Sequence, residues 1–284
     1  MTTTTWLSPE DYSKGEPFML EKTSIFAHTW LPLCAASQLA QHGDYMSATI
    51  GGWPLFAIRD SASIRAFRNI CRHQNMMIVE KPAGRCDVLQ CRYHGWQYGL
   101  DGRFIAAPPL VAPADAASPN NHLAPLATTE WLGLIFGSLL DVLLPTSMAF
   151  ADLAAASPDA ENQGQEFVHA QTTDVACNWK TFVERRLADQ WTFQWPMLTV
   201  LAKPGAVIVE QVVPRSFVRT RVVSMVLCPE SNRAEFTASA ARAIQDAVPQ
   251  IEAIQHRYEN GDTQAIDVPA AHAFRARVRS ATRG

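Results

Sequence analysis

The sequence has a small share of charged residues and no long apolar run. Charged residues make up 18% of the 284 residues and the net charge is −3. A basic stripe that would attract phosphates is missing, so nucleic-acid binding is not expected. No run approaches the roughly 18 apolar residues that a membrane-spanning helix needs. The first ten residues have neither the basic nor the apolar stretch of a secretory leader. We therefore expect a soluble, cytoplasmic protein with no membrane partner.

Cysteine is sparse and histidine is unevenly spread. The six cysteines are few for a chain of this length, and in a reducing compartment they are expected to be free thiols or metal ligands rather than disulfides. No histidine occurs between His169 and His256. That long segment cannot supply an imidazole to any site.

Changes in composition along the chain predict three parts. Residues 1–40 have helical or irregular character, and residues 41–140 contain short alternating runs divided by Gly and Pro, which is typical of an all-β unit. Residues 141–284 begin with an Ala, Ser, Pro and Asp-rich stretch to residue 165 that resembles a linker. Beyond it the patterns predict a helix over 178–190, a hairpin joined around Pro214, and a helix over 234–258 that Pro249 can interrupt.

The strongest motif is a pair of Cys/His loops. Cys71 and His73 are separated by one residue, seventeen residues follow, and Cys91 then precedes His94. A Rieske centre holds one iron by two thiolates and the other by two imidazoles. Two neighbouring loops that each give one Cys and one His match that requirement, and Gly95 suits a crowded cluster loop. The motif therefore predicts that Cys71, His73, Cys91 and His94 bind a [2Fe–2S] cluster.

Two other interpretations of these four residues are open. A structural zinc site is one, although its first pair is usually C-x2–4-C rather than C-x-H. Four unrelated buried residues are the other. Cys86 lies nearby without a matching cysteine and is expected to be an ordinary thiol. No Ser or Thr hydroxyl follows His94 to bond a cluster sulfur, which favours a potential near the low end of the Rieske range, about −150 mV.

These residues and their flanks resemble the α subunits of Rieske non-haem iron oxygenases, the aromatic-ring hydroxylases and their amine-oxidising relatives. The resemblance covers most of the chain. It implies an α+β protein in which an N-terminal all-β Rieske domain (41–140) precedes a reduced helix-grip domain with an antiparallel sheet (141–284), and residues 1–40 pack on the latter. The matching segments are Ile25-Phe26, Thr29-Trp30, Gly43-Asp44-Tyr45, Gly51-Gly52, Arg65 to Asn69, Cys71-Arg72-His73, Cys91 to Tyr98, Asp101-Gly102-Arg103 and Asn178 to Glu184.

The resemblance also implies a mononuclear iron site that this sequence does not complete. In the family, the helix after Asn178-Trp179-Lys180 carries an Asp and two His ligands, and a later Asp completes a 2-His-1-carboxylate triad. Those positions fall here on Ala188, Trp191, Pro196 and, near Asp246, Ala247. The stretch from Pro196 to Gly205 is also shorter than in the family. We therefore expect the mononuclear iron to be absent and Trp191, Phe193 and Trp195 to fill its place.

The leading hypothesis from the sequence is an auxiliary subunit that is not catalytic alone. It would take electrons from a ferredoxin or flavin reductase and pass them to the mononuclear iron of a catalytic Rieske oxygenase partner. That partner would act on a small aromatic or amine compound, in a hetero-oligomer that the resemblance implies to be a trimer or a three-plus-three ring. Asp189 lies one position from the place of the bridging Asp and is a candidate contact of a neighbouring cluster histidine.

Three alternatives remain open at this point. One is a structural or regulatory subunit whose cluster transfers no electrons. Another is an active monooxygenase or dioxygenase with atypical iron ligands around Asp246, Glu252 and His256, of which the last two share a helix face. We expect Glu252 and His256 to be a surface pair instead, and His169 to be a structural histidine. A zinc-binding interaction module is the remaining alternative.

Overall fold

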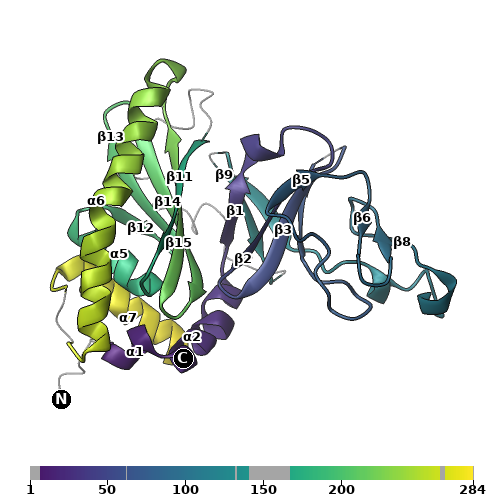
Figure 1. The fold of residues 1–284 in the computed structure, drawn as a ribbon, viewed down its shortest axis with the longest axis horizontal. Helices are drawn as coiled ribbons and strands as arrows, with labels where there is room; N and C mark the ends of the chain where they lie inside the picture. Colours follow the sequence, from purple (N-terminus) through teal and green to yellow (C-terminus); the bar gives the residue numbers. More distant parts are fainter. Residues whose placement is uncertain (1–6, 62, 132, 141–166, 263–265, 284) are drawn as a thin grey trace. The chain divides into compact units, whose positions relative to one another are not determined.

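A computed structural model describes residues 7–61, 63–131, 133–140, 167–262 and 266–283. The expected linker over 141–165 lies outside the described residues. The chain divides into two compact units (Figure 1): a loop-rich β unit of residues 31–142, and a C-terminal unit that combines residues 1–30 with 143–284. The first strand, β1, belongs to the β unit, so this unit starts earlier than the expected residue 41. None of the described helices is long and apolar enough to cross a membrane.

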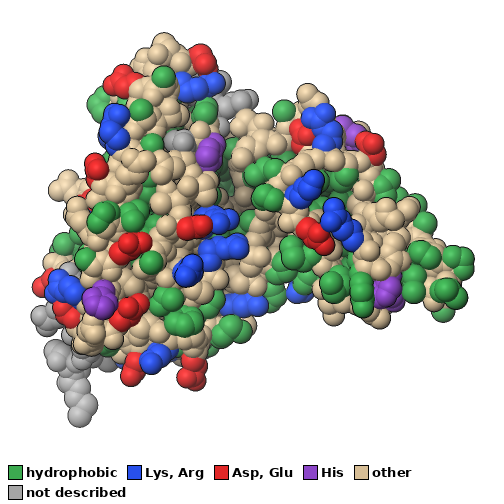
Figure 2. All heavy atoms as spheres, viewed as in Figure 1, with side chains coloured by type: hydrophobic (Ala, Val, Ile, Leu, Met, Phe, Trp, Pro, Cys, Tyr) green, Lys and Arg blue, Asp and Glu red, His purple; other side chains and the backbone are tan. Residues whose placement is uncertain are grey.

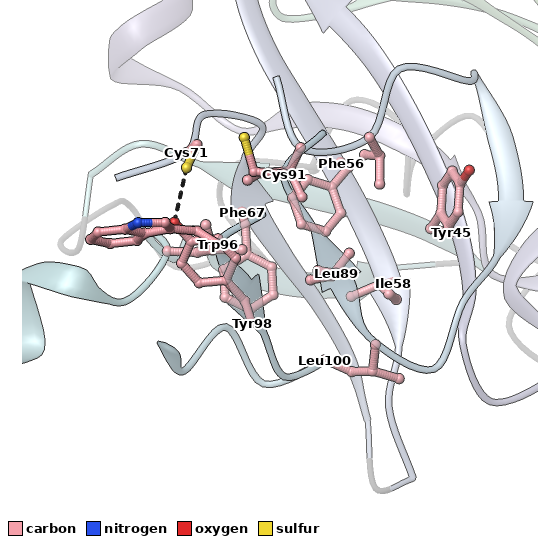
Figure 3. Packing of buried hydrophobic residues seen from close by; sticks show 13 residues of the cluster. Tyr45, Phe56, Ile58, Phe67, Cys71, Leu89, Cys91, Trp96, Tyr98 and Leu100 are labelled. Carbon is pink, nitrogen blue, oxygen red and sulfur yellow. Dashed lines mark hydrogen bonds between the residues drawn. The ribbon is translucent and has the colours of Figure 1, made fainter. Parts of the chain in front are cut away.

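The β unit consists of short antiparallel strands in three sheets, with strand orders β4-β3-β2-β5, β1-β10-β9 and β6-β7-β8. Its core has the aromatic rings of Phe56, Phe67 and Tyr98 packed with the cluster-loop cysteines (Figure 3). The strands are β1 (Leu31–Ala35), β2 (Asp44–Ile50), β3 (Trp53–Arg59), β4 (Ile64–Arg68), β5 (Ala83–Arg85), β6 (Leu89–Gln90), β7 (Gln97–Tyr98), β8 (Phe104–Ala106), β9 (Ala127–Trp131) and β10 (Leu134–Ser138).

The C-terminal unit has one antiparallel sheet with strand order β11-β15-β14-β13-β12. The long helix α6 contacts β11 and β15, and Figure 1 shows it running along this sheet. The strands are β11 (Phe167–Val175), β12 (Thr192–Gln194), β13 (Leu198–Lys203), β14 (Ala206–Ser216) and β15 (Arg219–Leu227), and the α-helices are α1 (Pro9–Ser13), α2 (Gly15–Ser24), α5 (Trp179–Ala188), α6 (Arg233–Glu259) and α7 (Pro269–Arg283).

Local sequence explains most of these elements, with two differences. β-Branched residues fill β14 and β15, which pair as the expected hairpin. Its turn lies at Phe217–Val218 rather than at Pro214, because Pro214 stays in β14 where the register shifts before Ser216. Helix α6 continues through Pro249, since the favourable packing of its buried face outweighs the missing hydrogen bond. The predicted class, α+β with an all-β domain and an antiparallel sheet, is confirmed.

Candidate cluster site and the helix α5 region

The first Cys/His loop is held by backbone hydrogen bonds and by one buried side chain. The Cys71 amide donates to the Met76 carbonyl at 2.7 Å, and the Asn75 amide donates to the Cys71 carbonyl at 3.0 Å. The buried Asn69 carboxamide accepts from the amides of Ile78 and Val79 and donates to the Val79 carbonyl. Asn69 therefore joins the two ends of the loop and fixes where Cys71 and His73 lie.

The second loop repeats the same turn. The Cys91 amide donates to the Trp96 carbonyl at 2.9 Å, and the Gly95 amide donates to the Cys91 carbonyl at 2.9 Å. The fourth residue after each cysteine has positive φ, +58° at Asn75 and +74° at Gly95. A Cβ at Gly95 would lie 3.2 Å from Pro108 Cγ, so glycine suits this position on both counts. The two loops are thus two copies of one backbone conformation.

The four predicted ligands come together between these loops. Cys71 and Cys91 are both buried, and their thiol groups interact with each other. The His73 and His94 rings have centroids 4.7 Å apart, and the buried Nδ1 of His73 has no hydrogen-bond partner. A buried imidazole nitrogen left without a partner is what a metal ligand presents before its metal is added. This donor set fits a [2Fe–2S] cluster.

The spacing of the ligands also argues against a single metal ion. Among the described residues, no three His, Cys, Asp or Glu side chains lie close enough to share one ion. A Rieske cluster needs fewer protein ligands at each metal, because each of its two irons takes only two. Burial raises the pKa of the Cys71 thiol, so bound iron is what would hold this sulfur as a thiolate.

Two aromatic residues lie next to the predicted ligands His73 and Cys71. The Trp96 ring stacks on His73 at a centroid distance of 5.0 Å and donates its indole N–H to the Val111 carbonyl. The Tyr98 hydroxyl lies 3.1 Å from Cys71 Sγ (Figure 3) and accepts the Arg72 amide at 3.1 Å. Burial raises the pKa of Tyr98, which keeps its hydroxyl protonated and able to donate to the sulfur.

The Tyr98 contact changes the expectation of a low potential. The low potential was expected because no Ser or Thr follows His94. The Tyr98 hydroxyl instead comes from strand β7 and reaches Cys71 in the first loop. A hydrogen bond to a cluster sulfur stabilises the more negative reduced state and raises the potential. The missed signal was Tyr98 itself, four residues after His94.

In the C-terminal unit, the Asn178-Trp179-Lys180 motif has structural partners. Asn178 caps α5 by accepting the Lys180 amide at 3.0 Å. The Trp179 indole N–H donates to Glu21 at 2.7 Å, and the fully buried Lys180 ammonium pairs with the same carboxylate. These residues attach helix α2 to helix α5.

Glu184 of the same motif is also buried and fully bonded. Its carboxylate accepts hydrogen bonds from the hydroxyls of Tyr12 and Tyr258 and from the Arg275 guanidinium. The two tyrosine rings stack at 4.1 Å. Glu184 therefore connects α1, α6 and α7, which places the motif's carboxylate in the packing of the unit rather than at a metal.

The positions that the resemblance assigns to iron ligands hold other side chains. Ala188 ends α5, and Trp191 packs in an apolar cluster with residues of β14, β15 and α6. The Arg186 guanidinium lies 4.5 Å from the Trp191 ring centroid and makes two hydrogen bonds to the buried Glu210 carboxylate. Helix α5 does not fit an iron held by two imidazoles.

The other predicted aromatic and acidic residues are likewise in packing contacts. Phe193 and Trp195 contact each other and Phe274 of α7. Asp189 pairs with Arg185 one turn earlier on the helix. The structure thus brings the three aromatic residues into apolar packing, with Trp191 in a separate cluster.

The alternative ligands on α6 are not brought together. Glu252 accepts the Ala176 amide at 2.9 Å, and His256 is 76% exposed and lies near Glu259 and Asn260. Asp246 is exposed, and His169 bonds Thr172 at 2.9 Å. These residues make separate local contacts.

Comparison with known proteins agrees with the loop geometry. A family model described as the Rieske [2Fe–2S] domain matches residues 29–125. The α subunit of benzene 1,2-dioxygenase from Pseudomonas putida is 31% identical over 195 residues, which are 65% of this chain and 42% of the relative. The chain is a homologue of Rieske non-haem iron oxygenase α subunits.

Other relatives of this Rieske protein include amine-oxidising oxygenases. The glycine betaine monooxygenase oxygenase subunit of Chromohalobacter salexigens is 34% identical over 131 residues, or 46% of this chain and 29% of the relative. In both curated matches, the aligned part spans less than half of the relative's length.

Solved structures show that the fold extends over both units. The quaternary ammonium Rieske monooxygenase CntA has a TM-score of 0.79 at 19% identity and covers 98% of this chain and 96% of its own. A naphthalene 1,2-dioxygenase has a TM-score of 0.80 at 17% identity and covers 99% of this chain and 93% of its own. At these identities the similarity establishes the fold alone.

These comparisons correct the functional hypothesis drawn from the sequence. An auxiliary subunit that relays electrons to a separate catalytic partner was expected, yet the relatives are named as dioxygenase α subunits and monooxygenase oxygenase subunits. The Rieske cluster is supported, whereas the expected absence of a mononuclear iron is not, because the relatives belong to a non-haem iron oxygenase family. The absence of histidine from helix α5 concerns one helix and does not determine the role of the whole chain.

Proposed function

We propose that this chain is an oxygenase-type subunit that oxidises a small organic compound with electrons received at its Rieske cluster. Cys71 and Cys91 hold one iron of the cluster, and His73 and His94 hold the other. The observation that carries the proposal is the matched pair of loops, in which both cysteines are buried and the histidine rings lie side by side. When bound, such a cluster accepts and gives up one electron at a time.

The residues around the ligands have separate parts in this proposal. Asn69 and the two turn hydrogen bonds in each loop keep the ligands in place without the metal. Trp96 covers one face of His73 and shields it from water. Tyr98 donates to Cys71 Sγ and favours the reduced state.

The electron donor in this proposal is a ferredoxin or flavin reductase in the cytoplasm, and the chain works in an oligomer of oxygenase subunits. The substrate class is an amine or an aromatic compound, following the betaine, carnitine and benzene in the names of the relatives. In this proposal the described residues of the C-terminal unit form the catalytic helix-grip domain. Its iron ligands would have to come from residues other than those of helix α5, because that helix carries no histidine.

Three measurements on the anaerobically reconstituted full chain test the proposal. Iron per chain is determined together with the electron paramagnetic resonance spectrum of the reduced protein. Turnover is then followed with a reductase, oxygen and two substrate panels, one of quaternary ammonium compounds and one of aromatic hydrocarbons. Three irons per chain, a Rieske signal and an oxygenated product from one panel are expected.

Each result has a distinct meaning for the proposal. A reducible cluster with only two irons and no product from either panel would reject the oxygenase function while leaving the cluster assignment intact. A chain without the Rieske signal after reconstitution would reject the cluster assignment itself. His94→Ala is the matched variant, because it should abolish both the signal and the product.

A further inference from the structure

Two tyrosines and a carboxylate form a buried cluster in the C-terminal unit that the proposed function does not use. Tyr12 is 1% exposed, Tyr258 is 2% exposed and Glu184 is fully buried. They come from α1, α6 and α5, which meet at the end of this unit that carries α1 (Figure 1). The two phenol rings stack with their centroids 4.1 Å apart and 11° between their planes. Oxidation of a phenol near neutral pH requires a base that takes its proton, and here both hydroxyls donate to a carboxylate.

The two oxygens of the Glu184 carboxylate have different partners. Oε1 accepts the Tyr12 hydroxyl, whereas Oε2 accepts the Tyr258 hydroxyl at 2.9 Å and the Arg275 guanidinium at 2.6 Å. The positive charge of Arg275 thus lies against Oε2 and leaves Oε1 as the more basic oxygen. Burial raises the pKa of both phenols, so both keep their protons in the resting protein. Tyr12 is therefore the tyrosine with the better proton acceptor.

The charges around Tyr12 occur in opposite pairs. The Lys180 ammonium lies 5.4 Å from the Tyr12 ring centroid and is paired with the Glu21 carboxylate. The Arg275 guanidinium is paired with Glu184. Figure 2 shows that acidic and basic side chains are also interspersed on the visible surface of this unit. Loss of an electron from Tyr12 is therefore not opposed by an unpaired buried cation.

Two tryptophans form a route of oxidisable rings between Tyr12 and the surface. The fully buried Trp179 ring has its centroid 5.5 Å from the same Lys180 ammonium, so it is a close neighbour of Tyr12. The half-buried Trp195 ring lies 6.5 Å from Trp179. The exposed Arg277 guanidinium lies 4.6 Å from the Trp195 ring centroid. Trp195 therefore carries the route to the side of the unit where solvent has access.

We propose that Tyr12 is a redox-active tyrosine, which gives one electron to an oxidant formed from dioxygen and its proton to Glu184. The electron leaves through Trp179 and Trp195, and the oxidant is reduced by one electron. The O–H bond of Tyr12 breaks, an O–H bond forms at Glu184 Oε1, and a neutral tyrosyl radical stacked on Tyr258 remains. Return of one electron and of the proton restores the pair. This inference goes beyond the proposed function, because none of these residues is a cluster ligand.

The test oxidises the full chain with light and detects the radical. A soluble ruthenium polypyridyl sensitiser, with persulfate as the final electron acceptor, supplies the one-electron oxidant. Freeze-quenched samples are read by electron paramagnetic resonance, in which an oxidised [2Fe–2S] cluster gives no signal. We expect a tyrosyl signal that lives at least about tenfold longer than that of free tyrosine under the same illumination, because the pair is shielded from water.

Five variants assign the signal. Tyr12→Phe should lose the long-lived signal, and Tyr258→Phe should keep it with a shorter lifetime. Glu184→Gln should lower its yield at least about tenfold, because a carboxamide is a much weaker base than a carboxylate. Trp195→Phe should slow the formation of the signal without changing its decay. Tyr93→Phe is the matched control, because it replaces a tyrosine of the β unit that is 60% exposed, and it should keep the long-lived signal.

Two results would overturn the proposal. One is a wild-type chain without a long-lived tyrosyl signal, and the other is a signal that persists in Tyr12→Phe. Circular dichroism and size-exclusion chromatography check the fold of each variant. If Glu184→Gln does not fold, Tyr12→Phe decides, because it leaves Glu184 bonded to Tyr258 and Arg275. Neither result affects the cluster assignment, which depends on the spectrum of the reduced protein.

Discussion

The two units differ in whether their buried polar atoms have partners. In the β unit, Cys71 and Cys91 are buried in loops that close on themselves, and the buried Nδ1 atom of the half-buried His73 has no hydrogen-bond partner. In the C-terminal unit, the buried charges of α5 are paired with one another, as in Arg186 with Glu210. An unpartnered buried imidazole nitrogen is typical of a metal ligand, whereas a buried and paired Arg and Glu are typical of a packed interior.

This difference explains how the Asn178-Trp179-Lys180 motif can be present in a chain whose following helix lacks the iron ligands. Asn178, Trp179 and Lys180 each have a structural role at the start of α5, so the segment can remain whether or not the following helix holds iron. The four predicted cluster ligands have no comparable packing role: the Cys71 thiol contacts Cys91 and Tyr98, and the buried Nδ1 atom of His73 has no hydrogen-bond partner. The intact cluster motif is therefore stronger support for a metal than the intact start of α5.

The largest effect is expected from removing a cluster ligand. Cys71→Ser should abolish the Rieske signal and reduce the bound iron by at least two per chain, because one iron loses a thiolate and the cluster cannot assemble. Visible absorbance and iron content measure this. Cys86→Ser, in the same unit, is the control and should keep the full Rieske signal. Loss of the signal in Cys86→Ser would mean that the cluster ligands are wrongly assigned.

The buried charges of the C-terminal unit should dominate its stability. Arg186→Met leaves the Glu210 carboxylate unpaired in the interior and should lower the free energy of unfolding by about 3–5 kcal/mol. Chemical denaturation measures this value. Replacing both partners, as in Arg186→Met with Glu210→Leu, should recover most of it. A loss below about 1 kcal/mol in the single variant would show that the pair is not buried in solution.

A smaller effect is expected from the hydroxyl next to Cys71. Tyr98→Phe removes one hydrogen bond to a cluster sulfur, and a bond that is about 1.4 kcal/mol stronger in the reduced than in the oxidised state corresponds to a midpoint about 60 mV lower without it. A redox titration of the reconstituted chain measures the shift. An unchanged midpoint would mean that the hydroxyl does not donate to the sulfur when iron is bound.

The smallest effect concerns an exposed pair on the sheet of the C-terminal unit. Two hydrogen bonds of 2.8 Å from Arg221 lower the pKa of Asp174 below its usual value. Because the folded pKa is the lower one, the pair stabilises the fold above the ordinary Asp pKa, and this contribution is lost as pH falls through the folded value.

Arg221→Gln should therefore lower the free energy of unfolding by less than about 1 kcal/mol at neutral pH. The difference from wild type should vanish on acidification, as measured by urea denaturation at a series of pH values. A difference that grows toward low pH would contradict the assignment of the pair.

Several features could be anticipated from residues alone because they are local. The Cys/His spacing, the glycine at position 95 and the alternation in the strands each depend on a few neighbouring residues. The contact between Tyr98 and Cys71 could not be anticipated in this way, because it joins residues 27 positions apart through the pairing of β6 with β7. The hydrogen-bond partners of Glu184 could not be anticipated from the sequence either, since they come from α1, α6 and α7.

The sequence by itself determined the cluster loops and the lack of histidine after His169 and before His256, because both are statements about residue type and spacing. Only the tertiary structure decided that two loops share one backbone turn, that a tyrosine reaches the neighbouring loop's sulfur, and that Arg186 and Glu210 pair under Trp191. Those facts depend on segments far apart in the chain that hydrophobic burial brings together, and burial is what makes each unpaired donor or charge costly.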